Sequence, residues 1–297
     1  MSVSSQTSST TPLRPIVLCA DDYAIAPGVS RTICELIQRG RLTATGCMTV
    51  SPFWREHARW LQLLAGRADI GLHLTLTDLT PLGLMPRLAP DGRLPTLGAL
   101  MKAAFLGRLD GAELRAEIAR QIDEFTTGFG RAPDFVDGHK HVHLLPGVRS
   151  ALFDVLRARA NGTARPYLRN CHVTPAAALR RGVASGKALI LGVLSSGFAR
   201  RARAAGFATN PSFSGVYDFS GRIPYEQLLE RFLADLPAGA IVMCHPGEPD
   251  DDLRRVDAVV DQRAIERNVL AGDALPAILA RAGVMLARFP RQGVSAP

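Results

Sequence analysis

Short apolar runs alternate along the chain with segments in which apolar residues recur at helical spacing. The apolar runs cover 15–20, 42–50, 69–76, 134–143, 240–245 and 284–289. The helix-like segments cover 29–40, 111–130, 147–160 and 225–236. Strand and helix repeated in this order predict an α/β fold with a mostly parallel sheet, either open or closed into a barrel.

Local signals support these elements and divide the chain. Gly40 is suited to end the first helix in the left-handed conformation. The segment 111–130 places one apolar stripe along a helix, formed by Leu114, Ile118, Ile122 and Phe125. Two stretches, 77–99 with its four Pro and 206–224, interrupt the pattern and predict long loops of the kind that bind substrates. No composition break or repeat divides the rest. We therefore expect one domain over 14–290, between a disordered tail at 1–13 and a flexible tail at 291–297.

Composition narrows the class of protein. Of the 297 residues, 47% are hydrophobic and 21% charged, as in soluble globular proteins. No apolar run is long enough to span a bilayer, and the polar start lacks the features of a secretory signal, which favours the cytoplasm. The five Cys include no CxxC pair, and we expect free, buried thiols.

The net charge of +8 raises the question of a nucleic-acid partner. The densest basic group, at 199–206, has no interleaved aromatic residues, and a solvated helix face explains it better. We expect no nucleic-acid partner. Peripheral contact with an anionic membrane surface and assembly into a homo-oligomer both stay open.

Titratable residues gather where apolar runs end. Asp21 and Asp22 follow the first run; adjacent strand residues face opposite sides, so both can serve one site only if the chain turns there. Asp22 could instead cap the following helix. His73 lies inside an apolar run, where a lone His is usually structural, and His245 ends the run at 240–245.

The run 134–143 holds Asp137, His139, His141 and His143 at every second position. As a strand it would present all four on one face, either as the polar side of an edge strand or as part of a metal or catalytic site. Only one or two of its imidazoles can bind a single ion.

The carboxyl ends of barrel strands form one rim, so four strand ends of this kind predict a shared site. Two imidazoles and one carboxylate suit Zn²⁺, Co²⁺, Ni²⁺ or Fe²⁺, and a harder ion such as Mg²⁺ if carboxylate and water dominate. We expect one divalent ion, with Zn²⁺ or Mg²⁺ as the first candidates.

Five motifs in order, "ADDYAIAPGVS", "GLHLTLT", "DGHKHVHLLPGV", "NPSFSGVYDF" and "MCHPG", resemble the YdjC-like carbohydrate deacetylases, also called the ChbG/HpnK group. The resemblance extends from about residue 15 to 289. It implies a distorted, TIM-like (β/α) barrel with its active site at the carboxyl ends of the strands. It also implies removal of acetyl groups from N-acetylated sugars such as chitooligosaccharides, or from hopanoid-type glycolipids.

The resemblance also implies roles for individual residues. Asp22, His73 and His139 match the metal ligands, and Asp21 matches the catalytic base. His245 takes the place of a general acid or oxyanion stabiliser. The candidates for binding or orienting the substrate are Asp137, His141, His143 and Arg169. The chain departs from the family pattern at Tyr23-Ala24, Ser30 and Phe135, which puts the substrate in doubt more than the chemistry.

The mechanism implied is hydrolysis of an acetamide by water that the metal activates and Asp21 deprotonates, with His245 protonating the leaving amine. Three alternatives remain: a metal-dependent hydrolase of another amide or of a phosphoester, a nucleic-acid-binding module, and a non-catalytic sugar-binding protein. Phosphoester chemistry often uses two ions, so metal stoichiometry separates it from deacetylation.

Overall fold

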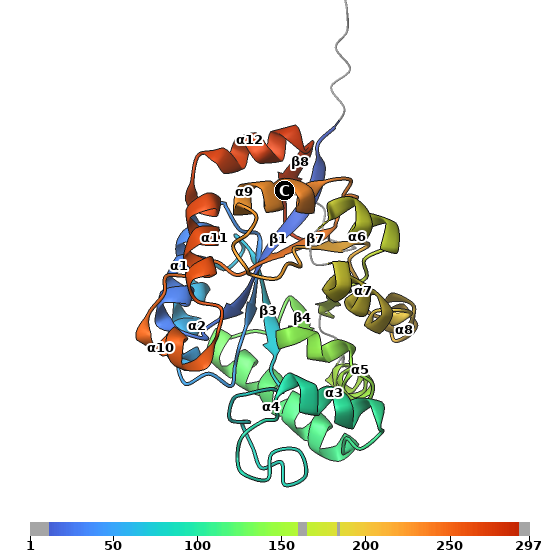
Figure 1. Ribbon diagram of the computed structural model, residues 1–297. Helices are drawn as coiled ribbons and strands as arrows, with labels where there is room; N and C mark the ends of the chain where they lie inside the picture. The colour runs from blue at the N-terminus through green and yellow to red at the C-terminus, as the bar shows by residue number, and fades with distance from the viewer. Residues whose placement is uncertain (1–11, 160–164, 183–184, 291–297) are drawn as a thin grey trace, which may run out of the picture.

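The computed structural model describes residues 12–159, 165–182 and 185–290. An eight-stranded parallel sheet forms its centre, in the order β5-β4-β3-β2-β1-β7-β6, with β8 pairing the first residues of β1 (Figure 1). The strands are β1 (Arg14–Tyr23), β2 (Ala44–Cys47), β3 (Asp69–Leu74), β4 (Phe135–Gly138), β5 (Tyr167–Leu168), β6 (Phe213–Ser214), β7 (Ile241–Cys244) and β8 (Val284–Leu286). The expected tails lie outside the described residues except for residues 12 and 13.

The two edges of the sheet are joined by short contacts rather than by a full strand pair. Leu168 in β5 forms an isolated parallel bridge with Thr209, ahead of β6. Next to it, the Asn210 amide donates to the Asn170 carbonyl at 2.8 Å and accepts from the Asn170 backbone N–H at 2.7 Å. The sheet is therefore a distorted (β/α) barrel, as the resemblance to the YdjC-like deacetylases implies.

Helices flank the sheet, with α1, α2, α10 and α11 on the left in Figure 1, α6, α7 and α8 on the right, and α3 and α4 below. Their bounds are α1 (Pro27–Gln38), α2 (Trp54–Gln62), α3 (Leu97–Phe105), α4 (Gly111–Phe129), α5 (Val148–Arg159), α6 (Pro175–Arg181), α7 (Ser185–Leu194), α8 (Phe198–Ala204), α9 (Tyr225–Leu233), α10 (Asp251–Val256), α11 (Asp261–Ala271) and α12 (Ala274–Arg281). None of the helices in the described ranges is long and apolar enough to cross a membrane.

Helix α4 illustrates how the sequence determines an element. Asp110 accepts hydrogen bonds from the backbone N–H groups of Ala112 and Glu113, and Gly130 ends the helix in the left-handed conformation. The predicted apolar stripe is buried along its whole length, at Leu114, Ile118, Ile122 and Phe125. This stripe packs the helix against the barrel.

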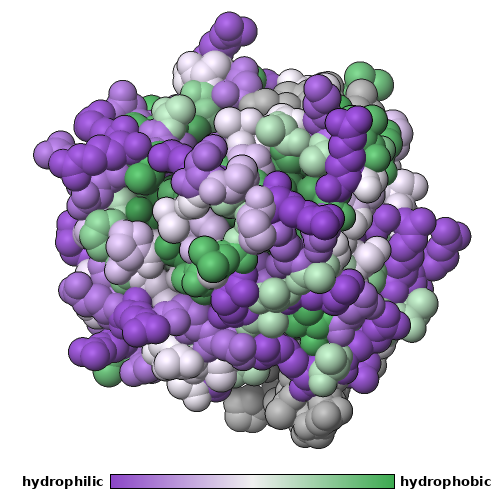
Figure 2. Space-filling view, turned by 90° about the horizontal axis from the view of Figure 1, so that it is seen from below, coloured by the Kyte–Doolittle hydropathy of each residue, from purple (hydrophilic) through white to green (hydrophobic). Residues whose placement is uncertain are grey.

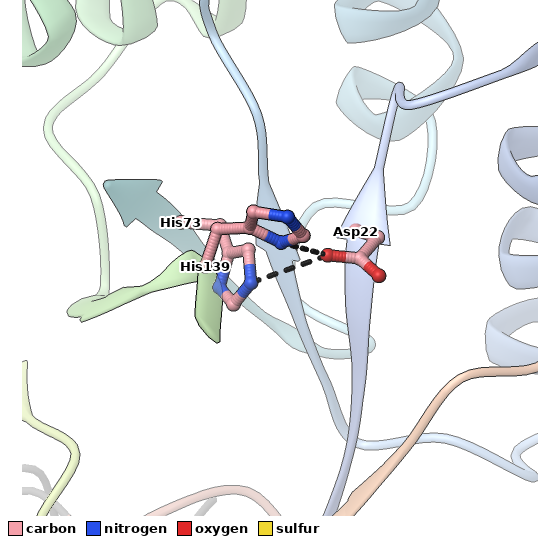
Figure 3. A group of neighbouring side chains, drawn as sticks. All are labelled: Asp22, His73 and His139. Carbon is pink, nitrogen blue, oxygen red and sulfur yellow. Dashed lines mark hydrogen bonds and ion pairs between the residues drawn. The ribbon is translucent and has the colours of Figure 1, made fainter. Parts of the chain in front are cut away.

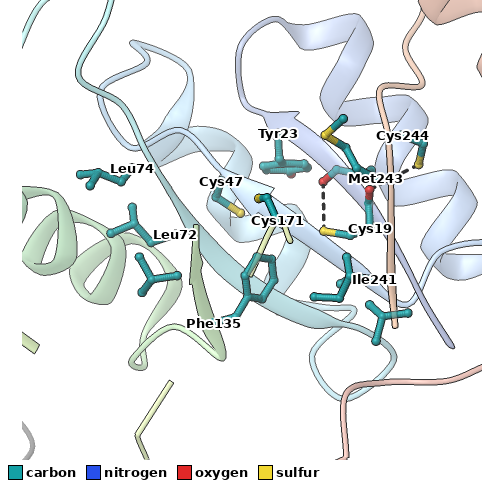
Figure 4. Close-up of a cluster of buried hydrophobic side chains, with 14 of the residues drawn as sticks. Cys19, Tyr23, Cys47, Leu72, Leu74, Phe135, Cys171, Ile241, Met243 and Cys244 are labelled. Atoms are coloured by element: carbon teal, nitrogen blue, oxygen red, sulfur yellow. Dashed lines mark hydrogen bonds between the residues drawn. The ribbon is translucent and has the colours of Figure 1, made fainter. Parts of the chain in front are cut away.

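Sulfur and aromatic side chains fill much of the barrel interior. Cys19, Cys47, Cys171 and Cys244 are buried among side chains such as Tyr23, Leu72 and Phe135 (Figure 4). All five cysteines, including the partly buried Cys34, are free, as expected. Burial raises the pKa of each of these thiols, which makes them part of the packing rather than nucleophiles.

The surface agrees with the expected solvation of the basic residues. Arg200, Arg201 and Arg203 on α8 are exposed, so the basic group at 199–206 is a solvated helix face. The face seen from below in Figure 2 is mostly hydrophilic, with hydrophobic residues in separate groups between the polar ones.

The prediction of a single strand over 134–143 is wrong. β4 ends at Gly138, and His139–Leu144 form a short 3-10 segment, η1, in which Lys140 and His141 adopt left-handed conformations with φ of 51° and 59°. The three imidazoles therefore do not share a strand face. The turn sends them in different directions, which determines the geometry of the site.

Candidate metal and active site

The end of β1 brings two consecutive carboxylates to one cavity of about 480 Å³, which Asp21 and Asp22 both line. They can do so because the backbone turns at Asp22 (φ 66°) and again at Ala24 (φ 73°). The hydroxyl of Ser30 accepts a hydrogen bond from the Ala24 N–H at 3.0 Å, and Ser51 donates to the Ala24 carbonyl. These contacts hold a backbone conformation that non-glycine residues rarely adopt.

The alternative role of Asp22 as a helix cap is wrong. The N-cap of α1 is Ala26, which provides no side-chain cap, and Pro27 follows in the first turn. Asp22 is instead held inside the site. Burial alone would raise its pKa, but the charges of His139 and Arg263 outweigh burial and hold the pKa well below its usual range.

Three side chains from three strand ends converge at Asp22 (Figure 3). Its Oδ1 lies 2.8 Å from Nδ1 of His139 and 3.3 Å from Nε2 of His73. One ligand atom from each residue lies within 4.8 Å of the other two, close enough for a single ion to bind all three. Two imidazoles and a carboxylate form a donor set typical of catalytic zinc and related ions.

A second carboxylate fixes the orientation of His73. Its Nδ1 lies 2.6 Å from Oδ1 of Asp137, the residue beside it in the β3–β4 pairing. Burial lowers the pKa of His73, but the charges of Asp137 and Asp21 raise it more, to about 10. With Nδ1 donating to Asp137, Nε2 faces Asp22, which is the arrangement of a metal-binding histidine supported by a carboxylate.

Arg169, which follows β5, joins Asp21 to Asp137. Its guanidinium donates to both oxygens of Asp21 at 2.6 Å and lies 2.7 Å from Oδ2 of Asp137. Asp21, His73 and Asp137 are also close enough to hold an ion, but this guanidinium already lies against both carboxylates. The geometry therefore favours one ion, at Asp22, rather than two.

The charges of the site fit one divalent ion. Four carboxylates contact only two guanidinium groups: Asp21 and Asp137 contact Arg169, and Asp22 and Asp257 contact Arg263. With His73 and His139 neutral, as metal ligands must be, this cluster carries two negative charges in excess, which a divalent ion would balance. A buried surplus of this kind is costly without a counter-charge, so the residues present fit a metal.

The other histidines of the run have different environments. The His143 side chain is fully buried, with Nε2 donating to the Arg169 carbonyl at 2.9 Å, and burial lowers its pKa to about 4. His141 lines the cavity, and its Nδ1 lies 3.4 Å from Sγ of Cys171. Asp137, His143 and Arg169 have no exposed surface, so they lie behind the cavity-lining residues and support them.

His245 also lines the cavity, directly after β7, the strand that pairs with β1. Its backbone N–H donates to Glu266 at 2.6 Å, and its ring meets the ring of Phe219 edge-on at 5.2 Å. Its Nδ1 is buried without a hydrogen-bond partner in the part of the chain that the structure describes. Of the two expected binding loops, 206–224 contributes Val216, Tyr217 and Phe219 to the cavity, and 77–99 contributes Leu97.

Sequence reasoning missed the contribution of α11. Arg263 and Glu266 are almost fully buried and reach Asp22 and His245, although they belong to a polar helical segment. Their spacing of three residues places them on one helix face, but a charged pair at that spacing is common on solvated helices. Only the tertiary contacts distinguish them.

The family model for YdjC-like protein matches residues 15–281. A chitooligosaccharide deacetylase of Serratia marcescens is 28% identical over 92% of this chain and 97% of its own length. A carbohydrate deacetylase of Mus musculus is 29% identical over 91% of this chain and 92% of its own.

Among solved structures, a putative cellobiose-phosphate cleavage protein of Enterococcus faecalis V583 has the same fold, with a TM-score of 0.69 at 22% identity. The match covers 93% of this chain and 97% of that one. The match to the family model over most of the chain, with the predicted motifs at the site just described, shows that this chain belongs to the YdjC-like protein family.

Proposed function

We propose that the protein is a metal-dependent hydrolase that removes an acetyl group from an N-acetylated sugar or glycolipid. The observation that carries the proposal is the convergence of Asp22, His73 and His139 beside a second carboxylate, Asp21, in one cavity. The deacetylases of S. marcescens and mouse support the reaction class.

Asp22, His73 and His139 would hold one divalent ion, for which the nitrogen donors favour Zn²⁺ over Mg²⁺. When bound, such an ion polarises a carbonyl and makes a water molecule more acidic. The chain contributes the geometry: Asp137 orients His73, and the turn at Asp22 directs one carboxylate oxygen to both imidazoles.

Asp21 is the proposed general base. It lines the cavity beside Asp22, and the two N–H groups of Arg169 fix its carboxylate plane from behind. A base must already lie within reach of the water it deprotonates, and a bidentate guanidinium provides that fixed position. The role of Arg169, in this proposal, is to orient Asp21 rather than to touch the substrate.

His245 is the proposed general acid for the leaving amine. It lines the cavity from the end of β7, which neighbours β1 on the side away from β3, so Asp22 lies between the strand ends that carry His73 and His245. An acetamide placed between them would present its carbonyl to the metal ligands and its nitrogen to His245. Protonation of the nitrogen is required because an amide ion is a poor leaving group.

The cavity also has an apolar wall that suits the less polar faces of a sugar or the start of a lipid chain. Its members come from α3, α7, β7 and neighbouring loops: Leu97, Met101, Leu145, Ile190, Leu191, Leu194, Val216, Met243 and Val259. The polar lining residues include Asp21, Asp22, the histidines, Asp257 and Arg263. A lining of both kinds suits a substrate with one reactive polar group attached to a larger, less polar body.

The test is acetate release from N,N′-diacetylchitobiose and from N-acetylated glycolipids, measured with the metal content of the same samples. We expect Asp21→Asn to keep its metal and lose deacetylation by about 100-fold or more. Asp154→Asn, on the half-exposed face of α5, is the matched control and should keep both. Undiminished acetate release by Asp21→Asn with its metal bound would remove Asp21 as the base.

A further inference from the structure

Helix α11 places two buried charged side chains, one helical turn apart, against two functional residues of the cavity. Arg263 has 1% of its surface exposed and Glu266 has none. Arg263 contacts the metal-ligand candidate Asp22, and Glu266 contacts His245. We propose that Arg263 and Glu266 are positioning residues of the reaction, the first for the metal ligand and the second for the general acid. This inference rests on the proposed function.

Arg263 gives the two oxygens of Asp22 different partners. Its Nη2 donates to Oδ2 of Asp22 at 2.6 Å, so Oδ1 is the oxygen that faces His73 and His139. The guanidinium is itself fixed, since Nε donates to the Val259 carbonyl at 2.9 Å and Nη2 also pairs with Asp257. The terminal torsion of an Asp is soft, and this charge-assisted bond restricts it to one orientation.

Glu266 holds His245 by two routes. Directly, its carboxylate accepts the backbone N–H of His245 at 2.6 Å. Indirectly, it accepts the hydroxyl of Tyr217, whose ring packs on Phe219 with centroids 4.2 Å apart, and Phe219 meets the His245 ring edge-on. Phe219 has φ of 59°, a conformation that needs support from its surroundings. The Glu266 carboxylate therefore supports both the backbone of His245 and the aromatic side chains beside its ring.

The two roles predict different losses. A defect in orienting Asp22 should appear in metal binding, because supporting residues of this kind are worth about 10- to 100-fold in affinity. A defect in placing His245 should appear in protonation of the leaving group and leave metal binding intact. General loss of structure would affect both properties in both variants.

The first experiment measures the Zn²⁺ dissociation constant of the full chain by competition with a chromophoric chelator. We expect Arg263→Gln to raise it about 10-fold or more and Glu266→Gln to leave it within threefold of wild type. Loss of the positive charge of Arg263 would by itself tighten Zn²⁺ binding. An increase in the dissociation constant therefore reports that Asp22 has lost its orientation. Arg267→Gln, on the same helix and outside the cavity, is the matched control. An unchanged or lower constant for Arg263→Gln overturns its positioning role.

The second experiment compares two substrates of the zinc-loaded protein. Hydrolysis of N,N′-diacetylchitobiose needs a protonated amine, whereas 4-nitrophenyl acetate releases a phenolate that needs no acid. We expect Glu266→Gln to lower kcat for the amide about 10-fold or more and to leave ester hydrolysis within threefold. Tyr217→Phe, which removes one hydroxyl, should also lower the ratio of amide to ester hydrolysis. This milder variant keeps the test valid if the Glu266 variant does not fold.

His245→Asn separates failure of this inference from failure of the proposed function. If His245→Asn does not lower amide hydrolysis selectively, His245 is not the acid and the proposed function is wrong on that point. If His245→Asn lowers it selectively but Glu266→Gln and Tyr217→Phe do not, the positioning role of Glu266 is refuted.

Discussion

Acidification should destabilise the fold through His143, and the size of the effect follows from the structure. The imidazole is fully buried, which favours its neutral form, and burial outweighs the opposite effect of the hydrogen bond that Nε2 donates to the Arg169 carbonyl. Burial lowers its pKa to about 4, against about 6.5 in an unfolded chain. Well above pH 6.5 neither state is protonated and this stabilisation is complete. As the pH falls towards 4, the unfolded chain takes up the proton first, and stability is lost.

The magnitude can be worked out from these two pKa values. Lowering the pH from 7.5 to 4.5 should reduce the free energy of unfolding by about 2.5 kcal/mol through His143 alone. The perturbation is His143→Gln, which does not titrate but keeps a nitrogen donor for the Arg169 carbonyl. Other groups titrate alike in both proteins and cancel in the comparison.

The assay is urea unfolding followed by circular dichroism at several pH values and one fixed metal concentration. Wild type should lose about 2.5 kcal/mol more than His143→Gln across this range. Equal pH dependence of wild type and His143→Gln would refute the view that His143 is a neutral internal support.

Two further substitutions test the packing around the site. Arg169→Met should lower the free energy of unfolding in urea by about 3 kcal/mol or more, because Asp21 and Asp137 would be left buried without their shared cation. A loss below about 1 kcal/mol would show that the ion pairs of Arg169 with these two carboxylates do not stabilise the fold. Gly71→Ala should cost about 1–3 kcal/mol, since its Cβ would lie 2.4 Å from the ring of Phe135, and the double variant with Phe135→Leu should regain part of that loss. Failure of the second change to restore stability would show that the clash is not with this ring.

The parts of the fold that depend on local pattern could be predicted from the sequence. The apolar stripe of α4 and the strands β1 and β7, which carry Asp22 and lead to His245, follow from periodicity and turn residues. β5 and β6 contain two residues each, which is too short for any periodic signal. They are defined by pairing with strands that are distant in the sequence.

The sequence pointed to several of the side chains that line the cavity but not to their geometry. Alternation of His with Lys and Val predicts a strand, yet Gly138 ends β4 and the left-handed residues Lys140 and His141 turn the chain. Tertiary packing overrides the local pattern there. Arg263 was hidden for a related reason, because a charged residue on a polar helix gives no sign that it will be buried against Asp22.

The most direct test of the account is to remove all metal from the protein and titrate Zn²⁺ back while measuring acetate release from N,N′-diacetylchitobiose. The metal-free protein should release no acetate, and the rate of release should rise with added Zn²⁺ to a plateau at one ion per chain. His139→Ala should not regain activity at the same zinc concentration. Acetate release by the metal-free protein would contradict metal dependence. A plateau that needs two ions per chain would contradict the single site at Asp22, His73 and His139.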